Sequence, residues 1–345
     1  MRQIFTAGAI VFISAGAWWQ MGATAGIPTA AAAAQGGQAA APVAAPPGGF
    51  VSVGPADPST IRPGAPAAGC TSGLVKDGPG GNNFNPGTIA TVRSQDGRSW
   101  TVPAPVNVTG ASAADVFNNC TGIGDHPDHL ANLQTVVIDP DGVEITAYIF
   151  GDNYFELYVN GRFVARDPVG MTPFNSNVVR FRARYPMTYA LMGVDWETHH
   201  GIGMEYPQFN IGDAGMIAYF SDGNRTDAEW RVETFYIAPL DDPGCVRVAA
   251  GHDSTGCHQA EVPACAKDPK TCKALHFPIP ADWAMPGFDD SRWQRPTIWP
   301  PAAVTGQRAY TGYAKLFGDA EFIWTGNLKL DNLVLARYTA RGPRR

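Results

Sequence analysis

Short runs of alternating apolar and polar residues recur along most of the chain. In residues 154–159, YFELYV, the apolar Phe155, Leu157 and Val159 occupy every second position. Because successive side chains of a β-strand point to opposite faces, this alternation predicts a strand with one face toward a core. Similar runs predict strands at Thr88–Val92, Ser99–Val102, Thr135–Ile138, Glu144–Phe150, Val178–Ala183, Thr188–Val194, Met216–Tyr219, Arg231–Ile237, Phe322–Thr325 and Asn332–Tyr338.

Turn-forming residues separate these runs. Asn160-Gly161 directly follows the 154–159 run, and this pair suits a two-residue hairpin loop because both positions need a positive φ. Strands at this spacing predict an all-β fold, either a sandwich or a barrel. Helical periodicity is weak, and the short helix that we expect lies at 111–119, with Ser112 as its N-cap.

The N-terminal part of the chain has a different composition. Arg2 precedes the apolar run Ile4–Trp19, which is too short for a comfortable membrane span, so we expect residues 1–25 to be a cleaved signal peptide, with an uncleaved anchor as the alternative. Residues 26–68 are rich in Ala, Pro and Gly and predict a disordered tether. Residues 69–345 would then form the β domain of a secreted or periplasmic protein, with no integral membrane span after cleavage.

The chain has six cysteines, and an even number in an exported protein favours disulfides. Four of them lie in 245–280, a polar segment that interrupts the strand pattern and predicts a disulfide-stapled loop insertion. A zinc module is the alternative there, although the segment has no Cys-x-x-Cys pair. The pairing stays open, with a Cys70–Cys120 bridge as the natural complement to local bridges. The cysteines are Cys70, Cys120, Cys245, Cys257, Cys265 and Cys272.

Charge changes the picture little. The net charge is −6 and 16% of residues are charged, so the chain offers no basic patch for a nucleic-acid partner. A hydrophobic content of 45% over 345 residues is enough for a large core.

Three segments resemble one known family. GDNYFELYVNGRFVARD (151–167) resembles the central hairpin of galactose-binding-like jelly-roll domains, which accompany many secreted glycoside hydrolases. WAMPGFDDSRW (283–293) resembles the Phe-Asp-Asp-Ser segment of the same domains, and AEFIW (320–324) is similar to the segment that follows it. In the family the Phe-Asp-Asp-Ser segment precedes the hairpin, whereas here it follows. The resemblance implies a jelly-roll-like antiparallel β-sandwich, as one domain or two interleaved subdomains, and a glycan or cell-surface polysaccharide as partner.

Sugar-binding domains of this kind combine aromatic faces with side chains that bond hydroxyl groups. We therefore expect an exposed aromatic platform near the hairpin, while simple turn and strand-cap roles for the polar residues are the alternative. The candidate ligand-binding residues are Asp152, Asn153, Tyr154, Asn160, Arg162, Trp196 and Trp293.

A second candidate site is a cluster of metal-binding side-chain types in GVDWETHHGIGME (193–205). Carboxylate and imidazole groups on one strand face favour a divalent metal, either calcium or a transition metal. The alternative is a solvated strand end. The candidate ligands are Glu197, His199 and His200, with His126 and His129 as distant partners.

The leading hypothesis is a secreted, non-catalytic carbohydrate or cell-surface glycan binding protein. The alternative is a metal-dependent exported protein, an enzyme or a metal-binding protein, that uses the His199-His200 cluster. A purely structural envelope protein is a third interpretation. Catalysis is not predicted, since the chain has no Gly-x-Ser-x-Gly motif and sequence alone does not give the carboxylate separation that glycoside hydrolysis needs.

Overall fold

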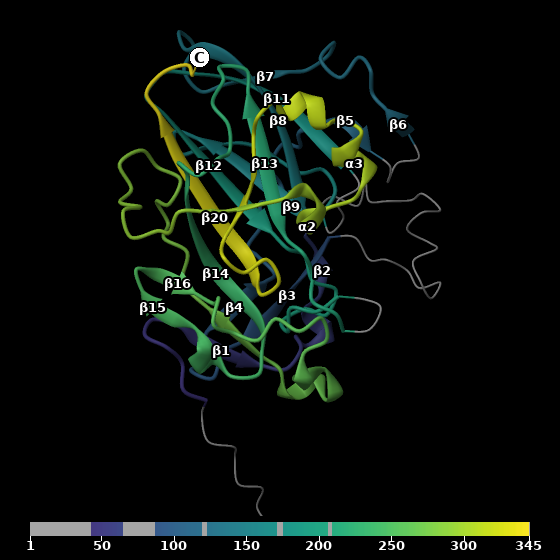
Figure 1. The fold of residues 1–345 in the computed structure, drawn as a ribbon, viewed down its shortest axis with the longest axis vertical. Helices are drawn as coiled ribbons and strands as arrows, with labels where there is room; N and C mark the ends of the chain where they lie inside the picture. Colours follow the sequence, from purple (N-terminus) through teal and green to yellow (C-terminus); the bar gives the residue numbers. More distant parts are fainter. Residues whose placement is uncertain (1–42, 65–86, 119–122, 171–174, 206–208, 345) are drawn as a thin grey trace, which may run out of the picture. The chain divides into compact units, whose positions relative to one another are not determined.

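Two mainly antiparallel sheets dominate the structure, a computed structural model that describes residues 43–64, 87–118, 123–170, 175–205 and 209–344 (Figure 1). Along the first sheet the strand order is β1 (Phe50–Val53), β17 (Lys273–His276), β14 (Arg231–Leu240), β20 (Asp331–Ala340), β12 (Met187–Val194), β9 (Tyr154–Val159) and β10 (Arg162–Arg166). Along the second it is β18 (Thr297–Trp299), β19 (Phe322–Trp324), β13 (Gly215–Phe220), β8 (Val143–Asp152), β11 (Asn175–Ala183), β5 (Ala114–Asn118) and β6 (Ile123–Asp125), while β7 (Thr135–Val137) pairs in parallel with β11.

Smaller elements complete the described chain. A small three-stranded sheet has the order β2 (Arg62–Pro63), β3 (Thr88–Arg93) and β4 (Ser99–Val102), and a two-stranded sheet pairs β15 (Arg247–Ala249) with β16 (Gly251–Asp253). The helices are all of one turn: η1 (Pro58–Thr60), η2 (Pro243–Cys245), η3 (Ala264–Lys267), η4 (Pro269–Thr271), α2 (Pro301–Val304), α3 (Arg308–Thr311) and η5 (Ala314–Phe317). No helix within the described ranges has the length and apolar character that a membrane crossing requires.

The alternating runs in the sequence correspond to strands. Each predicted strand overlaps an observed one, and the prediction of an all-β, antiparallel fold is confirmed. The predicted hairpin is confirmed as well: β9 and β10 pair antiparallel, with Arg162 opposite Val159. Asn160 and Gly161 both have positive φ, 50° and 76°, as a two-residue loop of this type requires.

The space between the two sheets is filled by apolar side chains from both. Phe155 and Leu157 of β9 share this core with Ile149 of β8 and Phe181 of β11, and all four are fully buried. The sheets approach closely at Gly193, where a Cβ atom would lie 2.5 Å from the Trp324 ring. A shared interior core of this kind is what makes two sheets a sandwich.

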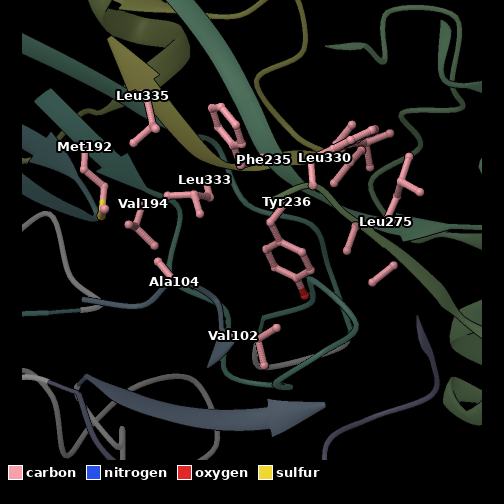
Figure 2. Packing of buried hydrophobic residues seen from close by; sticks show 14 of the residues in the cluster. Val102, Ala104, Met192, Val194, Phe235, Tyr236, Leu275, Leu330, Leu333 and Leu335 are labelled. Atoms are coloured by element: carbon pink, nitrogen blue, oxygen red, sulfur yellow. The ribbon is translucent and has the colours of Figure 1, made fainter. Parts of the chain in front are cut away.

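The opposite face of the first sheet is also buried. Val102 and Ala104, near the N-terminal end of the fold, pack with Val194 and Leu333 of the sheet (Figure 2). Polar groups on this face therefore need partners inside the protein. Glu156 is fully buried there, and its carboxylate accepts hydrogen bonds from the Tyr154 and Tyr158 hydroxyl groups at 3.0 and 2.6 Å.

Two sequence predictions need correction, and the choice between one domain and two interleaved subdomains stays open. The predicted tether, 26–68, cannot extend to residue 68, because β1 pairs with β17 and Val51 lies in the core. The helix expected at 111–119 is instead strand β5, which pairs with β11. From Val43 onward the described residues belong to one compact unit, so the structure does not separate two subdomains.

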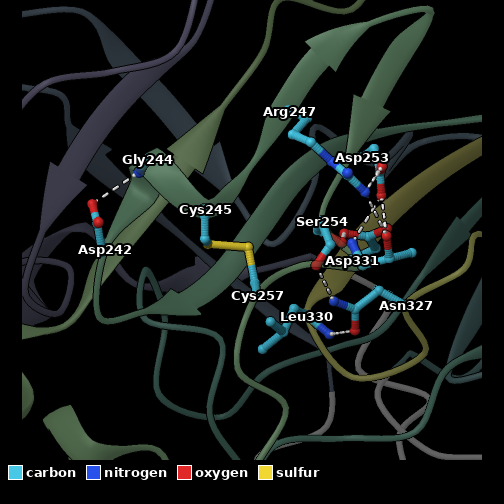
Figure 3. Close-up of a disulfide and its surroundings, with 11 residues drawn as sticks. Asp242, Gly244, Cys245, Arg247, Asp253, Ser254, Cys257, Asn327, Leu330 and Asp331 are labelled. Carbon is cyan, nitrogen blue, oxygen red and sulfur yellow. Dashed lines mark hydrogen bonds and ion pairs between the residues drawn. A yellow bond between two sulfur atoms is a disulfide. The ribbon is translucent and has the colours of Figure 1, made fainter.

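The cysteine-rich segment 245–280 is only partly a loop insertion. It contains the disulfides Cys245–Cys257 and Cys265–Cys272, which confirms local bridges, but it also supplies β17, a strand inside the first sheet. Near the first bridge, Ser254 donates a hydrogen bond to Asp331 of β20 at 2.7 Å (Figure 3). Cys70 and Cys120 lie outside the described residues.

Candidate functional site

The expected aromatic platform is absent at its predicted positions. Tyr154 and Trp196 are 0% exposed and Trp293 is 7% exposed, so none of the three can stack on a ligand in solution. The Trp196 indole N–H instead donates to the carbonyl oxygen of Thr88 at 2.7 Å. The platform that the resemblance implied is therefore not formed by these three residues: Trp196 lies under the segment that contains Thr88, and Trp293 packs against Phe235 and Phe288.

The polar candidates near the hairpin are structural. Asn153 is buried, and its side-chain oxygen accepts from the Trp196 backbone N–H at 2.6 Å while its amide donates to Asp152 at 3.0 Å. The Asn160 side-chain oxygen accepts from the Thr188 backbone at 2.8 Å, which fixes the turn. Arg162 is exposed. These residues therefore do not form one continuous surface.

The predicted metal ligand Glu197 is also occupied within the fold. Its buried carboxylate accepts backbone hydrogen bonds from Gly201 at 2.9 Å, Ile202 at 3.1 Å and Gly203, and a fourth from the Tyr236 hydroxyl group at 2.7 Å. Burial raises its pKa to about 7. This arrangement closes the turn that follows β12.

The two neighbouring histidines point to different partners. The His200 Nε2 atom lies 2.9 Å from both the hydroxyl and the carbonyl oxygen of Thr88, whereas the His199 ring stacks on Phe209 at 4.3 Å. Burial lowers the pKa of both imidazoles. Among the described residues, no three His, Cys, Asp or Glu side chains are arranged to hold a metal ion. The predicted ligand set is therefore not assembled there.

A group of four carboxyl side chains lies next to this turn: Asp152 and Asp195 are buried, Glu205 is half-buried and Asp213 is exposed. Desolvation is the largest cause of the raised pKa of each residue, and nearby carboxyl groups add to it: Asp213 raises the pKa of Asp152, Asp195 and Glu205, whereas Glu261 raises that of Asp213. The pKa of Glu205 reaches about 8 and that of Asp213 about 6. A Cβ atom on Gly212 would lie 2.7 Å from both carboxylate oxygens of Asp195, so this backbone approach depends on glycine.

A cleft of about 560 Å³ opens where β11 changes partners along one edge. Residues 175–178 of β11 pair with β5, and residues 180–182 pair with β7. The segment 126–134, which connects β6 to β7, forms a wall of the cleft. We call this site the His126 cleft. Its polar lining comprises Asp115, Asp125, His126, Asp128, His129, Asn132 and Gln134, and its apolar lining includes Val136, Val164, Val178 and Val179.

Asp115 is the polar centre of the His126 cleft. Its two oxygens accept hydrogen bonds from the side-chain amides of Asn118 at 3.0 Å and Asn177 at 3.3 Å. Burial raises the pKa of Asp115, and the nearby His126 opposes that shift. The Nε2 atom of His126 is buried and has no hydrogen-bond partner within the part of the chain that the structure describes.

His129 and Asp125 frame the entrance of the His126 cleft. The His129 ring lies 3.0 Å from the His126 carbonyl oxygen through Nδ1 and 3.3 Å from the Tyr148 hydroxyl group through Nε2. Arg308 donates to both oxygens of Asp125, at 3.1 and 3.0 Å. These contacts hold the wall segment against the second sheet.

The sequence had pointed to part of this site. His126 and His129 were proposed as metal partners of His199 and His200, but they lie in the cleft on the second sheet with Asp115. Asp115 itself was missed because its segment was predicted to be a helix. Residues 113–118, AADVFN, show no apolar/polar alternation, so the local sequence carries no clear strand signal for Asp115.

The His126 cleft combines hydrogen-bonding groups with an apolar lining, which suits a small polar ligand with carbon faces. The resemblance to galactose-binding-like domains remains a hypothesis. No family model, no curated protein and no solved structure matches this chain.

Proposed function

We propose that this chain is a secreted or periplasmic, non-catalytic glycan-binding protein with a jelly-roll-like sandwich, and that it binds the glycan in the His126 cleft. The observation that carries the proposal is the composition of that cleft: carboxylate, amide and imidazole groups beside four valines. Sugar rings present hydroxyl groups at their edges and C–H groups on their faces, so both kinds of lining have a counterpart in the ligand.

The size of the His126 cleft supports the same assignment. Its volume of about 560 Å³ lies in the range of small-molecule sites and leaves room for one or two sugar rings. Asn132 and Gln134 are exposed at the rim, where amide groups can both donate and accept hydrogen bonds. The two disulfides support an oxidising compartment.

Glycan-array binding by the purified chain, followed by calorimetry with the best ligand, tests the proposal. We expect the double variant Asn132→Ala/Gln134→Ala to bind at least about tenfold more weakly, because two hydrogen-bonding groups are lost. Gln307→Ala, an exposed amide outside the cleft, is the matched control and should bind normally. Binding that is unaffected by the double variant, in a protein that is otherwise folded, would place the glycan elsewhere.

The same measurement in the presence of chelator tests the metal-dependent alternative. Binding that disappears with chelator and returns with added calcium or zinc would favour a metal-bridged ligand. Unchanged binding would favour direct contacts between the protein and the sugar.

A further inference from the structure

The charges around the His126 cleft are not balanced. Three carboxyl groups line it, those of Asp115, Asp125 and Asp128, while among the described residues no Lys or Arg side chain is part of the lining. Unpaired charges of one sign in a cleft attract ligands of the opposite sign. Whether each carboxyl group already has an ion-pair partner therefore decides whether it can attract a cationic ligand.

The nearby arginines are already paired. Arg308 makes an ion pair with Asp125 at 3.0 Å. Arg180 lies 3.8 Å from Glu144, and its guanidinium group also donates to the Leu133 carbonyl oxygen at 3.4 Å. Neither arginine therefore compensates the other two carboxyl groups of the cleft.

Asp115 and Asp128 are the two carboxyl groups of the cleft that have no arginine partner among the described residues. Asp115 accepts hydrogen bonds from two neutral amides and has no ion pair among the described residues. Asp128 is exposed at the rim, and its carboxylate has neither a hydrogen bond nor an ion pair in the described part of the chain. One carboxyl group thus lies deeper in the cleft and one at its mouth.

We propose that the His126 cleft selects glycans that carry a free, protonated amino group, with Asp128 and Asp115 as the groups that read this charge. The inference rests on the proposed function, since it names the class of sugar for the same site. An ammonium group supplies three donors and a positive charge, which is what two carboxyl groups without a Lys or Arg partner among the described residues can accept. An acidic sugar would instead be repelled.

The experiment compares three β-1,4-linked trisaccharides that differ at one position of each ring: glucosamine, N-acetylglucosamine and glucose. Calorimetry with the purified full-length chain at about pH 7 is suitable, because a sugar amine with an ordinary amine pKa is then largely protonated. We expect the glucosamine trisaccharide to bind about tenfold more tightly than the other two. We also expect this preference to weaken as salt is raised, since exposed charges are screened.

Asp128→Asn should reduce the preference for the amine by about fivefold, which is at the upper end for an exposed ion pair, and should leave binding of the glucose trisaccharide unchanged. Asp282→Asn is the matched control, because Asp282 is an exposed carboxylate outside the cleft. Asp115→Asn keeps a side chain of the same shape and should reduce the preference further.

The outcomes distinguish a failure of amino-sugar selection from a failure of glycan binding. Equal binding of all three trisaccharides, or a preference that survives both substitutions, would overturn the selection of amino sugars and leave glycan binding intact. A chain that binds neither these trisaccharides nor any glycan on the array would overturn the proposed function itself. The inference is supported if the glucosamine trisaccharide binds more weakly to Asp128→Asn than to the wild type.

Discussion

Buried carboxyl groups differ in this protein by what surrounds them. Glu156 and Glu197 receive several hydrogen bonds each, so their side chains fix the backbone and hydroxyl groups around them. Asp195 is 4% exposed, and within the described residues its carboxylate has no hydrogen-bond donor. Residue type and burial alone therefore do not say whether an acidic residue stabilises the fold or strains it.

Glu197→Ala should destabilise the protein by about 4 kcal/mol. The substitution leaves three backbone N–H groups and the Tyr236 hydroxyl group without an acceptor in a buried turn, and each orphaned group costs about 1 kcal/mol or more. Urea denaturation measures the change. Glu321→Ala removes an exposed carboxylate and should change stability by less than about 0.5 kcal/mol.

Adding chelator to the wild type distinguishes this structural role from metal ligation. The hydrogen-bonded arrangement predicts an unchanged denaturation midpoint. A midpoint that falls with chelator in the wild type, but not in Glu197→Ala, would mean that Glu197 holds a metal after all.

At the scale of elements, the cysteine-rich segment depends on its bridges. Cys245 and Cys257 are 12 residues apart. Loss of the disulfide that closes this loop increases the conformational entropy of the unfolded chain and so destabilises the folded protein. We expect Cys245→Ala/Cys257→Ala to lose about 2–3 kcal/mol in denaturant unfolding. Because the bridge also places Ser254 near Asp331, amide exchange in 247–253 should increase more than in β8. Equal exchange in both regions would show that the bridge does not order this segment.

The strands with a clear alternation could be predicted from the sequence, whereas those without one could not. The strands β12 and β20 coincide with long alternating runs, and both were predicted. β17 was missed because Lys273–His276 lies among cysteines and polar residues, and its partners β1 and β14 are distant in sequence. The segment of β5 was predicted to be a helix because local residue preferences contain no information about its pairing with β11.

The site was less predictable than the fold for a related reason. The resemblance to sugar-binding domains predicted that Trp196 and Tyr154 are exposed, but both are buried. Alternation along a strand does not tell what covers its second face. The covering strands β3 and β4 precede the first sheet's central strands by about fifty residues or more. The His126 cleft likewise depends on β5, β7, β10 and β11 meeting at one edge, which no local pattern encodes.

At the scale of the whole molecule, carboxyl groups with a raised pKa make stability depend on pH. Asp152, Asp195, Glu205 and Asp213 lie together, with Glu197 beside them and with Lys329 and Glu261 facing Asp213 from outside. The pKa values of Glu197 and Glu205 are raised to about 7 and about 8, whereas in the unfolded chain both are near 4.3. The folded state therefore binds more protons, and stability falls as pH rises toward these values.

Buried histidines act in the opposite direction, but in a lower pH range. Burial lowers the pKa of His276 to about 3, so its contribution to stability is lost as pH falls below the unfolded value near 6.5. Above about pH 6.5 the buried histidines are neutral in both states, and the slope of stability against pH reports the carboxyl groups.

We therefore expect the free energy of unfolding to decrease between about pH 6.5 and 8, by an amount on the order of 2 kcal/mol. Asp195→Asn removes one carboxyl group with a raised pKa and one of the charges that raise the pKa of Asp152, so this variant should show a shallower decrease. Urea denaturation at several pH values measures both slopes, and Asp282→Asn, at an exposed position, should retain the wild-type slope. A wild-type stability that is constant or rising over this range would mean that these carboxyl groups are ionised in the folded protein, and that a cation not present among the described side chains compensates them.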